Sequence, residues 1–150
     1  MTQPGIKMKG LIGWTMLAWL AIASLLAADT DLRLLEAVQR GDSHAVRSLL
    51  EQKADVNGTR PNGETALQWA AYQDDQETAQ LLIGGSARVD AANEYGVTAL
   101  SLACTNRSDP MVRMLLEAGA NPNAAQSTGE TVLMTCARTG SLTAVRLLLE

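Results

Sequence analysis

The sequence predicts an all-α solenoid, a stack of helix–turn–helix units joined by extended β-turn loops. The main observation is a repeat with a period of 33 residues: GETAL at 63–67 returns as GVTAL at 96–100 and as GETVL at 129–133. A fixed period of this length is typical of stacked copies of one supersecondary unit, each burying its apolar face against its neighbours. In addition, apolar positions persist between copies while polar positions vary, as one shared core requires.

Residues 29–150 are interpreted as one repeat domain of four units, of which the last is incomplete. The units span 29–59, 60–92, 93–125 and 126–150. The first unit is weaker but keeps the register, because Leu34 aligns with Leu67, Leu100 and Leu133. The fourth unit has no closing loop, and three leucines at 147–149 lie in its last helix. This favours a piece of a longer array, and the alternatives are an end that a partner covers or an end that frays.

Within each unit, breaker and capping residues predict two helices. Gly41-Asp42-Ser43 separates the helices of the first unit, and Gly140-Ser141 those of the fourth. In the second unit, the acidic run Asp74, Asp75 and Glu77 is interpreted as helix capping and dipole complementarity rather than as a metal site. Gly84-Gly85 is interpreted as a helix end, because no phosphate-loop motif surrounds it.

The third unit shows the pattern most clearly. Its first helix is predicted over 98–105. Asp109 is expected to cap the second helix, with Pro110 in the first turn and Gly119 at the stop. Extended loops are expected after the second helices, at 54–57, 87–90 and 120–123.

These motifs resemble the ankyrin repeat, whose helical motif is Gly-x-Thr-Pro-Leu-His and whose loop motif is Gly-Ala-Asp-Val-Asn. The resemblance covers residues 29–150 and implies a solenoid with its first helices on the concave side. This chain departs from the helical motif at two positions. Ala66, Ala99 and Val132 replace the proline, and Gln68, Ser101 and Met134 replace the histidine. In the family that histidine hydrogen-bonds neighbouring loops, so the resemblance implies lower stiffness between units here.

Residues 1–28 are interpreted as a secretory signal peptide. Two lysines precede an apolar stretch over 11–26, and small residues follow at 26–28. The alternative is an uncleaved anchor formed by residues 11–28, but the apolar stretch is shorter than the roughly 20 residues that span a bilayer. We therefore expect an exported protein, periplasmic or secreted, and a membrane contact only if the segment is retained.

Composition and charge argue against several classes of function. The formal net charge is −4, and removal of two lysines with residues 1–28 leaves 10 basic and 16 acidic residues, or −6. An acidic chain with scattered arginines is a poor nucleic-acid binder. The single histidine, His44, is expected on an exposed helix face, so the sequence predicts no enzyme, no cofactor and no metal site.

The two cysteines lie one repeat apart at neighbouring helix positions. Cys104 and Cys136 occupy positions that other units fill with small residues, so buried free thiols are expected. A disulfide is the alternative in an oxidising compartment. It requires Cα atoms within about 7 Å, which stacked helices do not guarantee.

The predicted function is a non-catalytic protein–protein interaction module, an exported binding protein or adaptor. The binding surface is expected where polar positions vary, on the loop tips and first helices, with aromatic and Arg anchors inside an acidic rim. The predicted binding residues are Asn62, Glu64, Trp69, Tyr72, Gln73, Glu94, Tyr95, Thr105, Asn106, Glu130 and Arg138. Val97, Thr128 and Thr139 belong to the same variable face. The alternatives are a membrane-anchored structural scaffold and the N-terminal piece of a longer ankyrin protein with another domain downstream.

Overall fold

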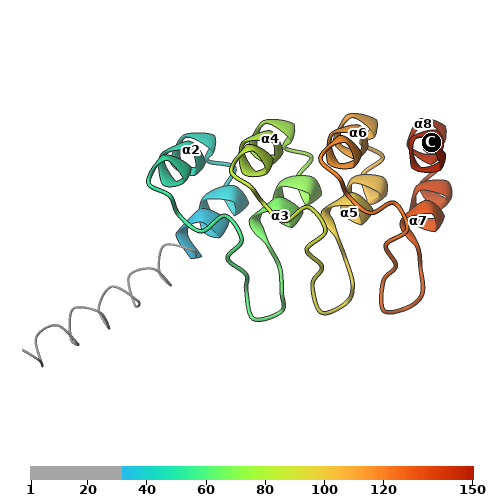
Figure 1. Cartoon of the computed structure of the whole chain (residues 1–150), viewed down its shortest axis with the longest axis horizontal. Helices are drawn as coiled ribbons and strands as arrows, with labels where there is room; N and C mark the ends of the chain where they lie inside the picture. The colour runs from blue at the N-terminus through green and yellow to red at the C-terminus, as the bar shows by residue number, and fades with distance from the viewer. Residues whose placement is uncertain (1–31) are drawn as a thin grey trace, which may run out of the picture.

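The computed structural model describes residues 32–150. The predicted signal peptide or anchor at 1–28 and the start of the first unit lie outside the described residues. The described part forms paired helices with extended loops, which confirms the predicted all-α solenoid (Figure 1). The helices are residues 32–39, α2 (Ser43–Glu51), α3 (Ala66–Tyr72), α4 (Gln76–Gly84), α5 (Ala99–Thr105), α6 (Asp109–Glu117), α7 (Val132–Thr139) and α8 (Leu142–Leu149).

The helices stand in two rows, with hairpin loops projecting beyond them (Figure 1). The first helices pack side by side, α3 on α5 and α5 on α7, and each also packs on the second helix of its own unit. The second helices α2, α4, α6 and α8 form the other row. Each loop closes with an isolated antiparallel bridge, such as the one between Ala92 and Thr98.

The core follows the 33-residue register. Leu34, Leu67 and Leu100 are buried, and small side chains such as Ala70 and Ala103 fill the contacts between first helices. Small residues let helices approach closely, which suits thin stacked layers. The apolar end of the fourth unit is uncovered among the described residues, with Leu142 and Leu149 largely exposed. That this end belongs to a longer array or meets a partner stays a prediction.

Capping residues of the second helices recur at the repeat interval. The N-caps of α2, α4, α6 and α8 are Asp42, Asp75, Ser108 and Ser141. The prediction that Asp109 caps α6 is therefore wrong: the Ser108 side chain accepts the hydrogen bond from the Met111 N–H, and Asp109 is the first helical residue. The cap position is set by the repeat register, which places Ser108 in line with the other three residues.

A hydrogen-bond ladder runs through the loop tips. The Glu94 N–H donates to the Asn62 carbonyl at 3.0 Å, and one repeat later the Ser127 N–H donates to the Tyr95 carbonyl at 2.9 Å. Gly96 directly follows Tyr95, whose carbonyl takes part in this ladder, and has a φ of +76°. A Cβ there would lie 2.9 Å from the Gln126 Cα, whereas Gly129, with a φ of +83°, has nothing within 4 Å.

We expect Gly96→Ala to destabilise the fold more than Gly129→Ala. Both substitutions place a Cβ in the left-handed region, which costs about 1–2 kcal/mol. Only Gly96→Ala also forces the next loop away, which adds about 1 kcal/mol or more. Urea unfolding measures the free energy of unfolding of both variants and the wild type. The loss in Gly129→Ala gives the backbone strain, and the additional loss in Gly96→Ala gives the cost of displacing the next loop. Equal losses for the two variants would show that the loops do not pack as closely as the structure indicates.

Gln68 links the second and third units. Its side-chain amide donates to the Ala91 and Val97 carbonyls at 2.9 and 2.8 Å, and its carbonyl oxygen accepts from the Thr65 N–H at 3.0 Å. The loop contact expected to be lost with the histidine is therefore present at this junction, because a glutamine amide donates two hydrogen bonds to loop carbonyls, and lower stiffness between units stays a prediction. At the next junction the Ser101 hydroxyl bonds only Thr98.

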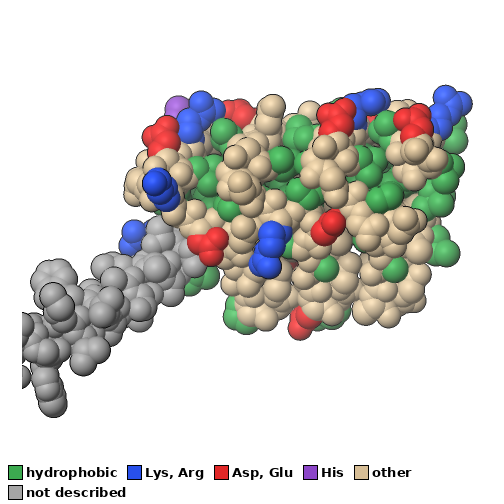
Figure 2. All heavy atoms as spheres, viewed as in Figure 1, with side chains coloured by type: hydrophobic (Ala, Val, Ile, Leu, Met, Phe, Trp, Pro, Cys, Tyr) green, Lys and Arg blue, Asp and Glu red, His purple; other side chains and the backbone are tan. Residues whose placement is uncertain are grey.

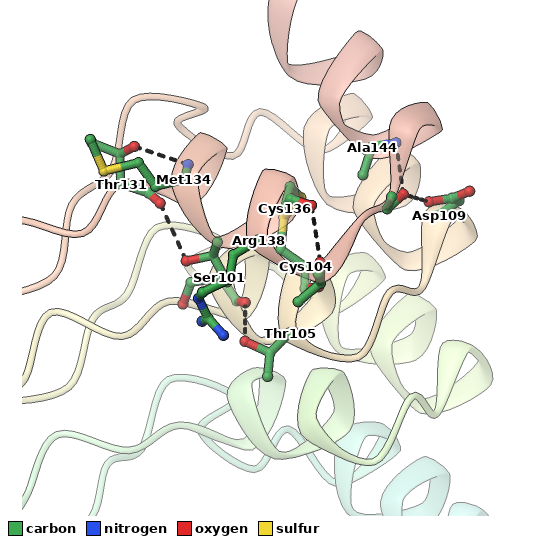
Figure 3. Close-up of a disulfide and its surroundings, with 12 residues drawn as sticks. Ser101, Cys104, Thr105, Asp109, Thr131, Met134, Cys136, Arg138 and Ala144 are labelled. Atoms are coloured by element: carbon green, nitrogen blue, oxygen red, sulfur yellow. Dashed lines mark hydrogen bonds between the residues drawn. A yellow bond between two sulfur atoms is a disulfide. The ribbon is translucent and has the colours of Figure 1, made fainter.

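A disulfide joins the third and fourth units, where Ser101 makes no such link. Cys104 of α5 and Cys136 of α7 are bonded, with Cα atoms 4.7 Å apart (Figure 3). The expectation of two free thiols is therefore wrong. The first helices approach closely enough because the small residues between them leave room for it. Both cysteines are fully buried.

Thr78 and Thr135 form a matched pair for testing buried hydroxyl groups. Both side chains are 1% exposed, but the Thr78 hydroxyl has no hydrogen-bond partner in the described part of the chain. The Thr135 hydroxyl donates to Glu130 at 3.0 Å. We expect Thr78→Val to stabilise the protein by about 1 kcal/mol and Thr135→Val to destabilise it by about as much. Thermal unfolding measures the stability of both variants. A loss of stability in Thr78→Val would contradict the claim that the buried Thr78 hydroxyl has no hydrogen-bond partner.

Candidate protein-binding face

Units two and three line a half-open pocket between their first helices and loops. Its volume is about 160 Å³. Its lining residues are Glu64, Gln68, Trp69, Tyr72, Asn93, Val97 and Leu102. The pocket thus brings together three of the predicted binding residues, Glu64, Trp69 and Tyr72.

Two aromatic side chains form one wall of the pocket. Trp69 and Tyr72, both on α3, meet edge to face with ring centroids 5.6 Å apart. This arrangement suits the charge distribution of aromatic rings. Tyr72 is 59% exposed, whereas Trp69 is half-buried. The Arg60 guanidinium lies 5.8 Å from the centroid of the Trp69 ring, within cation–π range.

Three polar residues of the lining, Glu64, Gln68 and Asn93, have partners within the chain, whereas the buried indole N–H of Trp69 has none among the described residues. Glu64 forms a loose ion pair with Arg60 at 3.9 Å. The Asn93 side-chain oxygen accepts from the backbone N–H groups of Tyr95 and Val97, both at 3.0 Å. Gln68 is occupied by the loop contacts described above. The pocket therefore offers mainly apolar surface to a ligand.

Glu94 and Tyr95 form the turn that directly follows the lining residue Asn93, and this turn is here called the rim. Tyr95 is 59% exposed. A hydrogen bond to Glu94 and the negative charge of that carboxylate raise the pKa of the Tyr95 hydroxyl above its usual value. The two side chains therefore form one polar unit on the loop tip.

A model of the ankyrin-repeat family, described as ankyrin repeats in three copies, matches residues 34–126. The chain belongs to the ankyrin-repeat family. Comparison with curated proteins gave no match. Ankyrin repeats are generally protein–protein interaction modules, and ankyrin domains are typically non-catalytic.

Gln73 and Asn106, predicted as free polar positions, hold adjacent ankyrin units together. The Gln73 amide donates to the Gln39 carbonyl at 2.8 Å, and the Asn106 amide donates to the Tyr72 carbonyl at 2.7 Å. One repeat later the Thr139 hydroxyl donates to the Cys104 carbonyl at 2.9 Å. Each of these residues satisfies a carbonyl near the end of the preceding first helix. Asn62 is similarly engaged in the loop ladder.

The remaining predicted residues, on the third and fourth ankyrin units, are not among the residues that line the pocket. Thr105 is exposed, and its hydroxyl donates to the Ser101 carbonyl at 3.0 Å. Arg138 and Glu130 form an ion pair at 3.1 Å. Hydrogen bonds from Arg138 and Thr135 lower the pKa of the Glu130 carboxyl. The acidic rim expected from Glu64, Glu94 and Glu130 is therefore partly neutralised by arginines.

Charged side chains gather elsewhere, over the second helices (top of Figure 2). Arg47 of α2 and Glu77 of α4, for example, form an ion pair at 3.1 Å with both side chains mostly exposed. His44 is also exposed on α2. The face formed by the second helices is therefore a solvated, charged surface. The aromatic pocket lies on the other side, among the first helices and loops.

Two lining positions show how the ankyrin register builds the pocket. Leu102 occupies the position of Trp69 one repeat later, and Val97 that of Glu64. Leu102 and Gln68 were not predicted as site residues, because an apolar or buried residue in a first helix is usually assigned to the core, and the loop residue Asn93 was also missed. Alignment of the repeats could have identified Leu102, because it occupies the position of the predicted binding residue Trp69.

Proposed function

We propose that this protein is an exported ankyrin-repeat protein that binds another protein through the first-helix face of units two and three. The observation that carries the proposal is the pocket walled by Trp69 and Tyr72. Tyr and Trp are enriched at interface hot spots, and here an exposed Tyr72 packs against a half-buried Trp69 at the pocket wall.

The disulfide supports export. Disulfides persist in secreted and periplasmic proteins and are rare in the cytosol, where thiols stay reduced. The signal-peptide pattern of residues 1–28 points the same way. Among the described residues, no helix is long and apolar enough to cross a membrane. The formal charge of −4 argues against nucleic acid as the partner.

Affinity capture from the native exported fraction, with mild cross-linking, tests the binding function. The baits are the wild type and the Tyr72→Ala/Tyr95→Ala variant, whose helix content we expect to be unchanged because both side chains are exposed. We expect a protein that only the wild type retains. Equal capture by both baits would reject this face, and no capture by either would reject the binding function.

Intact mass of the exported protein tests the location. A mature chain beginning at Asp29 is expected. A mass that still includes residues 1–28 in a membrane fraction would favour the anchored scaffold instead, and a larger mass would favour a longer ankyrin protein with another domain downstream.

A further inference from the structure

The exposed lining of the pocket is suited to one aliphatic side chain. Trp69, Tyr72, Val97 and Leu102 supply apolar walls, while the polar groups of Gln68 and Asn93 are used within the chain. A volume of about 160 Å³ corresponds to about five water-sized heavy atoms at about 30 Å³ each. The four heavy atoms of a Leu or Met side chain fit within this volume, and their burial releases water from the aromatic walls.

The charge at the rim favours a basic neighbour for that side chain. Glu64 and Glu130 are paired with Arg60 and Arg138, whereas Glu94 forms no ion pair among the described residues. Glu94 is exposed and follows directly on Asn93, a lining residue. A Lys or Arg close to the anchor on a bound segment would therefore meet a carboxylate that no cation of the described chain neutralises, which steers association and fixes the orientation of the segment.

We propose that this pocket takes a Leu or Met side chain from a partner polypeptide segment, and that a basic residue beside it on the segment contacts Glu94. The inference rests on the proposed binding function and specifies the chemistry of the partner. The anchor supplies most of the affinity, since buried apolar anchors dominate interfaces, and the rim contact supplies direction.

Selection of short random peptides displayed on phage, against the intact chain, tests the proposal. Enriched peptides are expected to share a Leu or Met with a Lys or Arg close by. In a binding assay with one such peptide, Tyr72→Ala is expected to weaken affinity by about tenfold or more, equivalent to about 1.4 kcal/mol. Val97→Arg, which fills the pocket, is a second variant with the same expected result.

The charge contact has its own matched control. Glu94→Lys is expected to weaken the binding of basic peptides several-fold, and the loss of affinity is expected to be larger at low salt. Glu117→Lys changes the charge equally on the exposed outer side of α6 and is expected to leave affinity unchanged. Equal effects of the two variants would overturn the rim contact.

Other occupants give other results. Enrichment of acidic peptides would point to Arg60 as the recognition group and overturn the proposal. A concentration-dependent dimer in sedimentation, lost in Tyr72→Ala, would show that a second copy covers the face, and this also overturns it. Failure to enrich any peptide overturns the segment-binding inference, whereas the capture experiment decides the binding function separately.

Discussion

Loss of the disulfide between Cys104 and Cys136 is expected to lower the free energy of unfolding by about 3–4 kcal/mol. The bond closes a loop of 32 residues, and a loop of this length restricts the unfolded chain by roughly that amount in the chain-entropy model. The loss is large against the total stability of a small domain, commonly about 5–15 kcal/mol. Urea unfolding of the wild type with and without a thiol reductant measures it.

The Cys104→Ala/Cys136→Ala variant is the control. It is expected to resemble the reduced wild type and to be insensitive to the reductant. Hydrogen exchange is expected to show α7 and α8 losing protection first, because the bond ties the fourth unit to the third. Two free thiols in the oxidised wild type, counted under denaturing conditions without reductant, would contradict the assignment.

Removal of the Gln68 side chain is expected to cost about 2–3 kcal/mol. Gln68→Ala deprives the Ala91 and Val97 carbonyls and the Thr65 N–H of their partner at a largely buried junction. The second and third units are then expected to separate more easily, so that unfolding becomes less cooperative. Chemical unfolding followed by tryptophan fluorescence in a chain that begins at Asp29, where Trp69 is the single tryptophan, reports on this junction directly.

Gln68→His distinguishes the hydrogen bonds from simple packing. Histidine is the residue of the ankyrin helical motif at this position, so it is expected to recover most of the lost stability. Gln68→Met keeps the approximate size without the amide donors and is expected to remain destabilised. Similar stability of the Met variant and the wild type would show that the loop contacts of Gln68 contribute little.

The 33-residue period was sufficient to predict the architecture. It places Leu34, Leu67 and Leu100 in one core and the caps of the second helices at regular intervals, because neighbouring units must repeat the same contacts. Asp109 was wrongly predicted as the N-cap of α6 from the capping preference of aspartate before a proline. The repeat register instead places the N-cap at Ser108. The disulfide could not be predicted, since it depends on a helix separation that residue spacing does not determine.

The site was only partly predictable for a related reason. Exposure of Tyr72 and Tyr95 follows from their variable positions, and both are exposed. Gln73 and Asn106 also occupy variable positions, but their amides bond helix carbonyls of the preceding unit. A polar side chain that varies between copies can therefore still serve the stack, and only the three-dimensional contacts separate the two roles.

Photo-cross-linking from defined positions tests most directly whether the first-helix face binds the partner. A photoreactive phenylalanine analogue replaces Tyr72 in one sample and Arg113, exposed on α6, in another. In the native exported fraction, we expect position 72 to label one protein partner and position 113 to label none. Labelling from position 113 alone would place the partner on the outer helices and contradict the account.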